Sequence, residues 1–181
     1  MTTTNVQLQE LARLLKINNL IILLQENLID AEPINLKNGR YVFNLSQNVA
    51  LDGGTHWTGL FCRDSVCMYY DSFGSTMPVK VLSWIKKGNP KARPKAIYIS
   101  IHISQALESN LCGWYVLGFL THNSRSENRN LNESTNSFVN QFSDNPDFNA
   151  GKIRQIFNMY IDKKHFPINL WRILFSKIKY T

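Results

Sequence analysis

Four side chains in this sequence have the chemistry of a thiol-dependent hydrolase. Cys112 opens an apolar segment, CGWYVLGFLT, that predicts a central buried helix. The free amide groups and the partial positive charge at a helix N-terminus stabilise a thiolate and a developing oxyanion. Gly113 leaves room for an incoming carbonyl group, and Gln105 is placed to donate a hydrogen bond to the same oxyanion. Ser109 or Asn110 is expected to cap this helix.

His56 and Asp71 complete the set, because the sequence predicts that they face each other across a β-hairpin. Two short predicted strands flank a loop centred on Arg63 and Asp64. In an antiparallel pair joined by an even-length loop, opposite residues have a constant index sum, which places His56 opposite Asp71 with Cβ atoms roughly 5 Å apart. An odd-length loop would shift this register. In this arrangement the imidazole shuttles a proton and the carboxylate orients the imidazole.

Each of these residues also has a purely structural interpretation. A cysteine in an apolar helix is usually an inert buried thiol, and a histidine in a strand is often satisfied by the backbone. The joint presence of four complementary groups favours catalysis. Cys62 and Cys67 with His56 suggest a metal site, but four well-spaced ligands are absent, so we expect no metal and assign both cysteines to strand packing. Three cysteines without a recognisable signal peptide favour free thiols in a reducing compartment.

The positive charge of the chain is concentrated in two blocks. The 181 residues carry 20 Lys and Arg against 13 Asp and Glu, a formal net charge of +7. Residues 80–95 and residues 151–181 each have a net charge of +6, and the remainder is mildly acidic. Such blocks are either solvated helix faces or attract polyanions by counterion release. The candidate nucleic-acid contacts in the first block are Lys86, Lys87, Lys91, Arg93 and Lys95.

The composition and the hydrophobic pattern predict one α+β domain over residues 1–181. Hydrophobic residues make up 44% and charged residues 18%, which excludes a disordered, collagen-like or coiled-coil chain. The longest apolar run, residues 20–24, is far too short to span a bilayer, so no membrane association is expected. We expect a loop at 125–136, helices at 6–17, 20–28, 75–87, 112–121, 134–142, 150–163 and 167–179, and strands at 41–46, 56–61, 66–71 and 96–103. Thr4 or Asn5 is expected to cap the first of these helices.

The order and spacing of these motifs resemble the adenain family, the adenovirus-type maturation proteases, which belong with the SUMO-protease-like cysteine peptidases. The resemblance rests on GGTHW at 53–57, YYDSFG at 69–74 and the glutamine seven residues before Cys-Gly. The amphipathic segment near the N-terminus and the Asn-Pro pair at 145–146 fit as well. The resemblance implies a cysteine-protease-like α+β fold, in which a central mixed or antiparallel sheet packs against helices and one buried helix bears the nucleophile.

The resemblance also implies roles for individual residues. The implied catalytic set is His56, Asp71, Gln105 and Cys112. The backbone N–H of Cys112 would contribute to the oxyanion hole, and Trp57 and Gly113 would lie at the substrate cleft. The implied function is a cysteine endopeptidase that cleaves viral capsid or structural precursors at Gly-containing sites during virion maturation. Its setting would be the virion or the host-cell interior, for a DNA virus, a virophage or a related mobile element, and not the secretory pathway.

Two departures from the adenovirus enzymes concern the catalytic acid and the activating peptide. Those enzymes have Glu in place of Asp71, whereas SUMO proteases have Asp. They also bind an activating peptide through a disulfide, but the corresponding region here, around Pro94, has no cysteine, so a peptide activator would bind non-covalently. They use DNA as a cofactor, and the basic blocks extend that expectation to this chain. The alternatives are a ubiquitin- or SUMO-like isopeptidase of the same fold and a nucleic-acid-binding protein whose protease site has decayed.

Overall fold

A five-stranded mixed sheet forms the centre of the computed structural model, which describes residues 3–33, 36–46, 56–87 and 90–161. The strand order in the sheet follows the chain, and β1 pairs with β2, and β4 with β5, in parallel. The pairs β2–β3 and β3–β4 are antiparallel. The strands are β1 (Leu20–Leu24), β2 (Arg40–Asn44), β3 (Trp57–Arg63), β4 (Val66–Tyr70) and β5 (Ala96–Ser100). The predicted α+β class is confirmed.

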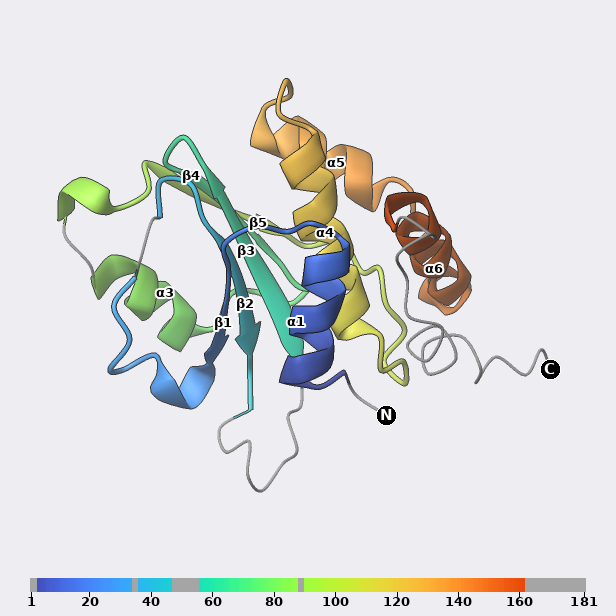
Figure 1. Cartoon of the computed structure of the whole chain (residues 1–181), viewed down its shortest axis with the longest axis horizontal. Coiled ribbons are helices and arrows are strands. Elements are labelled where there is room, and N and C mark those ends of the chain that lie inside the picture. Colours follow the sequence, from blue (N-terminus) through green and yellow to red (C-terminus); the bar gives the residue numbers. More distant parts are fainter. Residues whose placement is uncertain (1–2, 34–35, 47–55, 88–89, 162–181) are drawn as a thin grey trace.

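Helices cover both faces of the sheet (Figure 1). Helix α3 lies on one face, and the other α-helices of the described residues lie on the opposite face. The α-helices are α1 (Asn5–Leu14), α3 (Val79–Lys87), α4 (Cys112–Arg125), α5 (Leu131–Val139) and α6 (Asn149–Tyr160). Short 3-10 helices are η1 (Gln25–Asn27), η2 (Pro90–Ala92) and η3 (Pro146–Phe148). Among the described residues, no helix has the length and apolar character that a membrane crossing requires.

Strand alternation divides the apolar side chains into two cores. On β3, Trp57 and Phe61 point into the core shared with α1, α4, α5 and α6. Leu60 and Cys62, which alternate with them, point into the core beneath α3. Gly59 lies between Trp57 and Phe61, and a Cβ there would come within 2.9 Å of a side chain of α4. The glycine therefore lets α4 pack closely on the sheet.

Helix α4 is buried on all sides, as its sequence predicts. Every residue from Cys112 to Thr121 is buried. The helix packs against β3 and against helices α1, α5 and α6. Helix α1 begins with a capping box. The Thr4 hydroxyl accepts a hydrogen bond from the Gln7 backbone N–H, and the Gln7 side chain accepts one from the Thr4 backbone N–H. The cap on α1 agrees with the expectation from the sequence.

Several predicted elements differ in type or extent. Residues 20–28, expected as a helix, form β1 and η1 instead, because this short apolar run pairs in parallel with β2. The expected loop at 125–136 is interrupted by α5, which starts at Leu131 because the Asn130 side chain accepts from the Glu133 backbone N–H.

Other boundaries shift by a few residues. Helix α3 begins at Val79, not at 75, and β5 ends at Ser100, not at 103. Beyond Ser100 the chain leaves the sheet, and Ile101 is three-quarters exposed. The helices at 112–121 and 150–163 are confirmed with altered ends. The helix expected at 167–179 lies outside the described residues.

Cys62 and Cys67 form a disulfide, which corrects the expectation of free thiols at these positions. The two residues oppose each other in the register of β3 and β4, with Cα atoms 4.1 Å apart. They are therefore not available as zinc ligands. Within the residues that the structure describes, no group of three or more His, Cys, Asp or Glu side chains is arranged to hold a metal ion. Cys112 is a free, buried thiol.

Gly74 lies in the segment that follows β4, and its backbone requires glycine. Its φ is 70°, and a Cβ there would lie 2.7 Å from the backbone oxygen of Ile101. We expect Gly74→Ala to lower the free energy of unfolding by about 2 kcal/mol, because a left-handed conformation and a backbone clash both oppose the side chain. Chemical denaturation measures this change. Gly151→Ala, in α6 where a Cβ meets open space, is the control and should not destabilise. Equal stabilities of the two variants would contradict the prediction.

Candidate active site

His56 and Asp71 meet at one edge of the sheet. His56 immediately precedes β3, and Asp71 immediately follows β4. Because these strands are antiparallel, both residues lie at the same end of the hairpin. The His56 Nε2 and Asp71 Oδ1 atoms are 2.8 Å apart, and the two side chains are 14% and 2% exposed. This distance and this burial make them a tightly associated pair.

The contact forms through a register different from the predicted one. The turn consists of Asp64 and Ser65, both with positive φ, one residue later than expected. Extending the observed pairing therefore puts His56 opposite Phe73, and the two rings stack with centroids 4.5 Å apart. Asp71 is two residues before Phe73, so it lies on the same side of the strand and reaches His56 diagonally. The predicted register is wrong, but His56 and Asp71 still lie on the same face of the hairpin.

The residues after Asp71 hold its carboxylate in place. Asp71 Oδ1, which contacts His56, also accepts a hydrogen bond of 2.8 Å from the backbone N–H of Phe73. The backbone N–H of Gly74 donates to the backbone oxygen of Asp71 at 3.0 Å. One carboxylate oxygen therefore accepts from both the imidazole and the backbone. The tight turn at 71–74 orients the His56 ring through two contacts, the Asp71 carboxylate and the stacked Phe73 ring.

The electrostatic environment favours the charged form of His56. Burial by itself lowers the pKa of His56, but the hydrogen bond with the Asp71 carboxylate and the proximity of Cys112 outweigh burial and raise the pKa to about 9. Cys112 is therefore a near neighbour of the ring. The Nδ1 atom is buried and makes no hydrogen bond of standard geometry within the described residues. Catalytic hydrogen bonds are often long in a free enzyme and tighten when substrate binds.

Cys112 is the first residue of α4, and the start of this helix carries no side-chain cap. Leu111 occupies the N-cap position, so the expectation of a cap by Ser109 or Asn110 is wrong. The first amides of a helix have no intrahelical acceptors, and the helix dipole adds partial positive charge there. At the start of α4, beside Cys112, no capping side chain therefore accepts a hydrogen bond from the backbone N–H groups.

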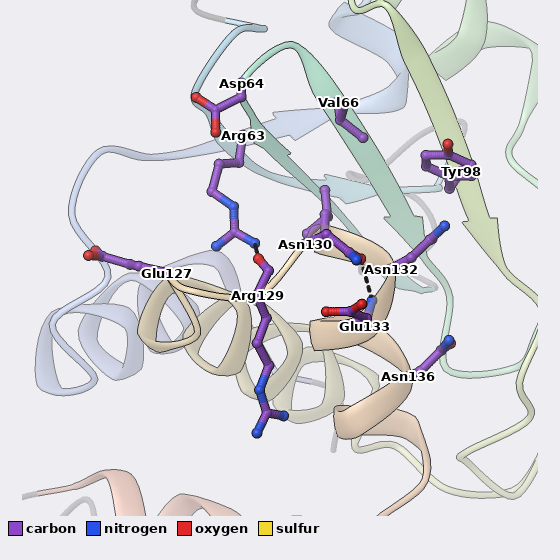
Figure 2. Close-up of a pocket in the computed structure, with 11 residues that line it drawn as sticks. Arg63, Asp64, Val66, Tyr98, Glu127, Arg129, Asn130, Asn132, Glu133 and Asn136 are labelled. Atoms are coloured by element: carbon purple, nitrogen blue, oxygen red, sulfur yellow. Dashed lines mark hydrogen bonds between the residues drawn. The ribbon is translucent and has the colours of Figure 1, made fainter.

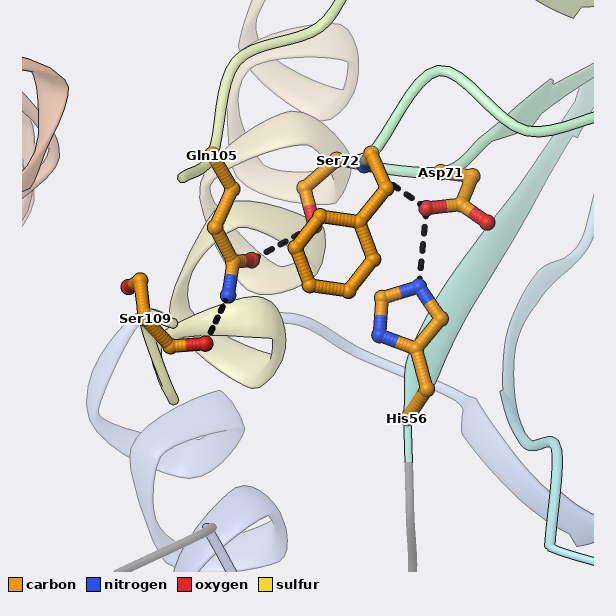
Figure 3. Close-up of polar contacts among 6 residues, drawn as sticks. His56, Asp71, Ser72, Gln105 and Ser109 are labelled. Carbon is orange, nitrogen blue, oxygen red and sulfur yellow. Dashed lines mark hydrogen bonds and ion pairs between the residues drawn. The ribbon is translucent and has the colours of Figure 1, made fainter. Parts of the chain in front are cut away.

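Gln105 is buried and bonded at both ends of its amide (Figure 3). Its Oε1 accepts from the Ser72 hydroxyl at 2.7 Å, and its Nε2 donates to the Ser109 carbonyl at 2.6 Å. The backbone N–H groups of Ser104 and Gln105 both donate to the Ser72 carbonyl. The segment that follows β5 is thereby tied to the residue next to Asp71. Gln105 is thus held between the turn that carries Asp71 and the segment that leads into Cys112.

Trp57 and Gly113, predicted to lie at the substrate cleft, both contact the N-terminal segment. Trp57 is 1% exposed, and its indole N–H donates to the Thr3 carbonyl at 2.8 Å. A Cβ on Gly113 would lie 3.1 Å from a Leu8 methyl and 3.2 Å from the Thr3 Cβ. The missing side chain of Gly113 therefore makes room for the N-terminal segment. The structure gives both residues a packing role beside Cys112.

The five basic residues predicted to contact nucleic acid are all exposed, but they lie on and after α3. Lys87 pairs with Glu32 at 3.0 Å and donates to the Ile29 carbonyl, so part of its charge is neutralised. Helix α3 and the helices around Cys112 cover opposite faces of the sheet (Figure 1). Lys86 and Lys87, at the end of α3, therefore lie on a different face of the sheet from α4 and Cys112. In the second basic block, only residues 151–161 are described.

A polar pocket of about 510 Å³ lies at the other end of the β3–β4 hairpin (Figure 2). Its lining includes Arg63 and Arg129 but also Glu127 and Glu133. The Arg63 guanidinium donates to the backbone oxygen of Ser126 at 3.0 Å and to that of Arg129. Arg63 therefore stabilises the chain after α4. The pocket is remote from His56, at the opposite end of β3, and does not contain the candidate catalytic groups.

Three contacts in the site were not anticipated from the sequence. The Ser72 hydroxyl, the Ser109 carbonyl and the Phe73 ring each contact one of the four candidate residues. Ser72 and Phe73 lie within the YYDSFG motif, so the motif marked their position without indicating a role. The alternation of a correctly registered strand would have paired Phe73 with His56. No sequence pattern indicates that Ser109 contributes through its backbone.

Comparison with known proteins supports the fold. No protein-family model matches the chain, and no curated protein matches it. The crystal structure of the ASFV pS273R protease is similar, with a TM-score of 0.50 and 15% sequence identity over 76% of this chain and 64% of that one. This chain thus spans less than two thirds of the length of that protease. At such low identity the likeness shows a shared fold, which agrees with the cysteine-protease-like fold expected from the sequence.

The raised pKa of His56 predicts a pH dependence of stability. Because the pKa rises from 6.5 to about 9 on folding, the charged imidazole stabilises the fold fully below pH 6.5, and this contribution is lost as the pH approaches 9. We expect the free energy of unfolding, measured by urea denaturation, to fall across this range in the wild type and to fall less in His56→Gln. Burial lowers the pKa of His122, so His122→Gln is the control and should keep the decline. Identical profiles for wild type and His56→Gln would contradict the assignment.

Proposed function

We propose that this protein is a cysteine endopeptidase that cleaves viral capsid or structural precursor proteins at Gly-containing sites during virion maturation. The observation that carries the proposal is the buried His56–Asp71 pair, whose imidazole also interacts with Cys112 at the start of a buried helix. A thiol, an imidazole and a carboxylate in this order are the parts of a cysteine protease. The fold shared with the ASFV pS273R protease supports the same general class.

In the proposed mechanism, the Cys112 thiolate attacks the scissile carbonyl carbon. A bond forms from sulfur to carbon, and the carbonyl π electrons move to oxygen to give a tetrahedral oxyanion. The backbone N–H of Cys112 and the Gln105 amide stabilise that oxyanion. The imidazolium of His56 then protonates the leaving amine as the carbon–nitrogen bond breaks, which leaves a thioester on Cys112. Asp71 keeps the imidazole oriented and favours its charged form.

The second half of the reaction releases the acyl group. Neutral His56 removes a proton from water, and the resulting hydroxide attacks the thioester carbonyl. The sulfur–carbon bond breaks, the carboxylic acid product leaves, and Cys112 returns to its thiolate form. The same oxyanion donors serve both halves, because both pass through a tetrahedral intermediate. No metal or organic cofactor takes part in these steps.

The arrangement of charges favours an active site over a decayed one. Burying a charged pair adds little stability compared with apolar side chains of similar volume. A site that has lost its function therefore has no need to keep the Asp71–His56 pair. Here the pair is retained at 2.8 Å. The choice between a capsid protein and a ubiquitin-like protein as substrate depends on the cleft, and the Gly-containing capsid site is the preference that the family resemblance supports.

Cleavage of co-expressed capsid precursors tests the proposal directly. We expect wild type to cut a precursor protein encoded next to its own gene and Cys112→Ala to leave it intact, because no other group in the site can form the thioester. Intact-mass measurement reports activity and the cut position together. A precursor with valine in place of the glycine beside the cut is the matched control and should resist cleavage. Ubiquitin and SUMO fusions tested in parallel distinguish an isopeptidase.

Three outcomes of that experiment would contradict all or part of the proposal. Cleavage that persists in Cys112→Ala would remove the thiol from the mechanism. Equal cleavage of the glycine and valine precursors would leave the thiol chemistry standing but would contradict the glycine specificity. Cleavage of ubiquitin or SUMO fusions, with the capsid precursor left intact, would replace the substrate class.

We further propose that DNA is a cofactor and that an activating peptide, if required, binds non-covalently. The DNA proposal is supported by the exposed basic side chains after α3, which lie apart from the catalytic residues. On that face, DNA would hold the enzyme on a nucleic-acid-rich particle without contacting the scissile bond. The absence of cysteine at Pro94 supports the non-covalent form of peptide binding.

Salt dependence tests the DNA proposal. We expect binding of a fluorescently labelled duplex, followed by anisotropy, to weaken as salt rises, because counterions are released from the phosphates. Replacing Lys86, Arg93 and Lys95 together with alanine should flatten the dependence of log K on log salt by about 0.9 for each phosphate that is no longer neutralised. Lys16→Gln removes an exposed charge outside the block and should leave the slope unchanged. Binding that does not vary with salt would contradict the proposal.

A further inference from the structure

Ser72 connects the two halves of the candidate site. It follows Asp71 directly, and it is fully buried. Its hydroxyl donates to Gln105 Oε1 at 2.7 Å, and its carbonyl accepts from the backbone N–H groups of Ser104 and Gln105 at 2.9 and 3.0 Å. Figure 3 shows the Ser72 hydroxyl and the Ser109 carbonyl bonded to the two ends of the Gln105 amide. The side chain and the backbone of one residue therefore both hold Gln105.

These contacts determine the direction in which the Gln105 amide points. The Ser109 carbonyl can only accept, so the nitrogen end of the amide must face it. The Ser72 hydroxyl then donates to the oxygen end. An amide nitrogen has two protons, and the Ser109 carbonyl takes one of them. The second proton is left to donate near the segment that leads into Cys112.

We propose that Ser72 is a positioning residue that prepares Gln105 to stabilise the oxyanion. The inference rests on the proposed protease function and adds to it a residue that does not itself touch the substrate. The Ser72 hydrogen bond has two effects on the amide. It satisfies a buried oxygen that would otherwise be unpaired, and it draws electron density toward that oxygen, which makes the opposite N–H a stronger donor.

This role predicts a specific kinetic pattern for Ser72→Ala. Removing a whole oxyanion donor costs about 10²–10³ in kcat, so loss of the group that orients the donor should cost less, about tenfold. KM should change by less than about twofold, because the interaction that Ser72→Ala removes acts in the transition state. The affinity for a peptide aldehyde, which forms a tetrahedral adduct with Cys112, should fall by about the same factor as kcat. The probes are a fluorogenic peptide amide and a peptide aldehyde, both ending in Gly-Gly.

Alkylation of Cys112 separates this role from a structural effect on Asp71. Iodoacetamide attacks the thiolate without forming an oxyanion, so its rate and pH dependence report on Cys112, His56 and Asp71 alone. We expect Ser72→Ala to alkylate like wild type. A changed alkylation profile would show that the substitution displaces Asp71 and would overturn the inference.

A double-mutant cycle shows whether Ser72 acts through Gln105. In a Gln105→Ala background, Ser72→Ala should have no further effect on kcat, because the amide that it orients is gone. Additive losses would overturn the inference. Ser72→Thr keeps the hydroxyl and should recover activity relative to Ser72→Ala. Ser134→Ala is the matched control, since this serine is equally buried but lies in α5, away from Gln105, and its kcat should match wild type.

The outcomes distinguish this inference from the proposed function on which it rests. Wild type that does not turn over the peptide amide, and whose Cys112 alkylates no faster than a free thiol, contradicts the protease function. Wild-type turnover with the same kcat in Ser72→Ala contradicts only the role of Ser72. A loss of kcat with unchanged alkylation and no further loss in the Gln105→Ala background supports it.

Discussion

The hydrogen bond between Asp71 and His56 is the interaction on which the geometry of the site depends. Asp71 is buried, and a buried carboxylate is tolerated when it is paired and hydrogen-bonded. Its Oδ1 accepts from the imidazole of His56 and from the backbone N–H of Phe73. The carboxylate in turn favours the charged imidazole, and the backbone bond holds the tight turn that ends at Gly74. One buried charge thus links the protonation of His56 to the path of the chain after β4.

That path explains how residues distant in the sequence come together. The turn after β4 carries Ser72, which holds the segment containing Gln105 through its hydroxyl and its carbonyl. The same segment continues through Ser109 to the start of α4 and Cys112. Helix α4 is positioned separately, by close packing on β3, where Gly59 allows the approach. The site therefore forms where the end of a hairpin meets the start of a helix, and each is held by its own set of contacts.

The N-terminal segment adds a further constraint beside Cys112. Thr3 accepts a hydrogen bond from Trp57, and Thr3 and Leu8 lie against Gly113. Trp57 and Gly113, which the family resemblance associates with a substrate cleft, contact the N-terminal segment of this chain. Helix α3, which ends with Lys86 and Lys87, lies on the opposite face of the sheet from α4 and Cys112. A polyanion bound at α3 would act by localising the protein, because the sheet separates it from Cys112.

The sequence by itself predicted the elements with strong local patterns. The buried helix at Cys112, the cap at Thr4 and the hairpin that carries His56 and Asp71 follow from periodicity, cap chemistry and strand alternation. The short run at 20–24 did not, because five apolar residues suit a helix or a strand equally until a neighbouring strand pairs with them. The motifs also indicated which four residues belong together, since their chemistry is complementary whatever their separation in the chain.

Only the tertiary structure decided how those residues are held. The hairpin register depends on a turn at Asp64 and Ser65 whose position local sequence left open, and it brought the Phe73 ring onto His56. The hydrogen bonds of Gln105 with Ser72 and with the Ser109 carbonyl depend on where three separate segments pack. Cys62 and Cys67 became bonded because the register placed them opposite each other. Residue types determine which chemistry is available, whereas distances between segments far apart in the chain arise only when the whole chain folds.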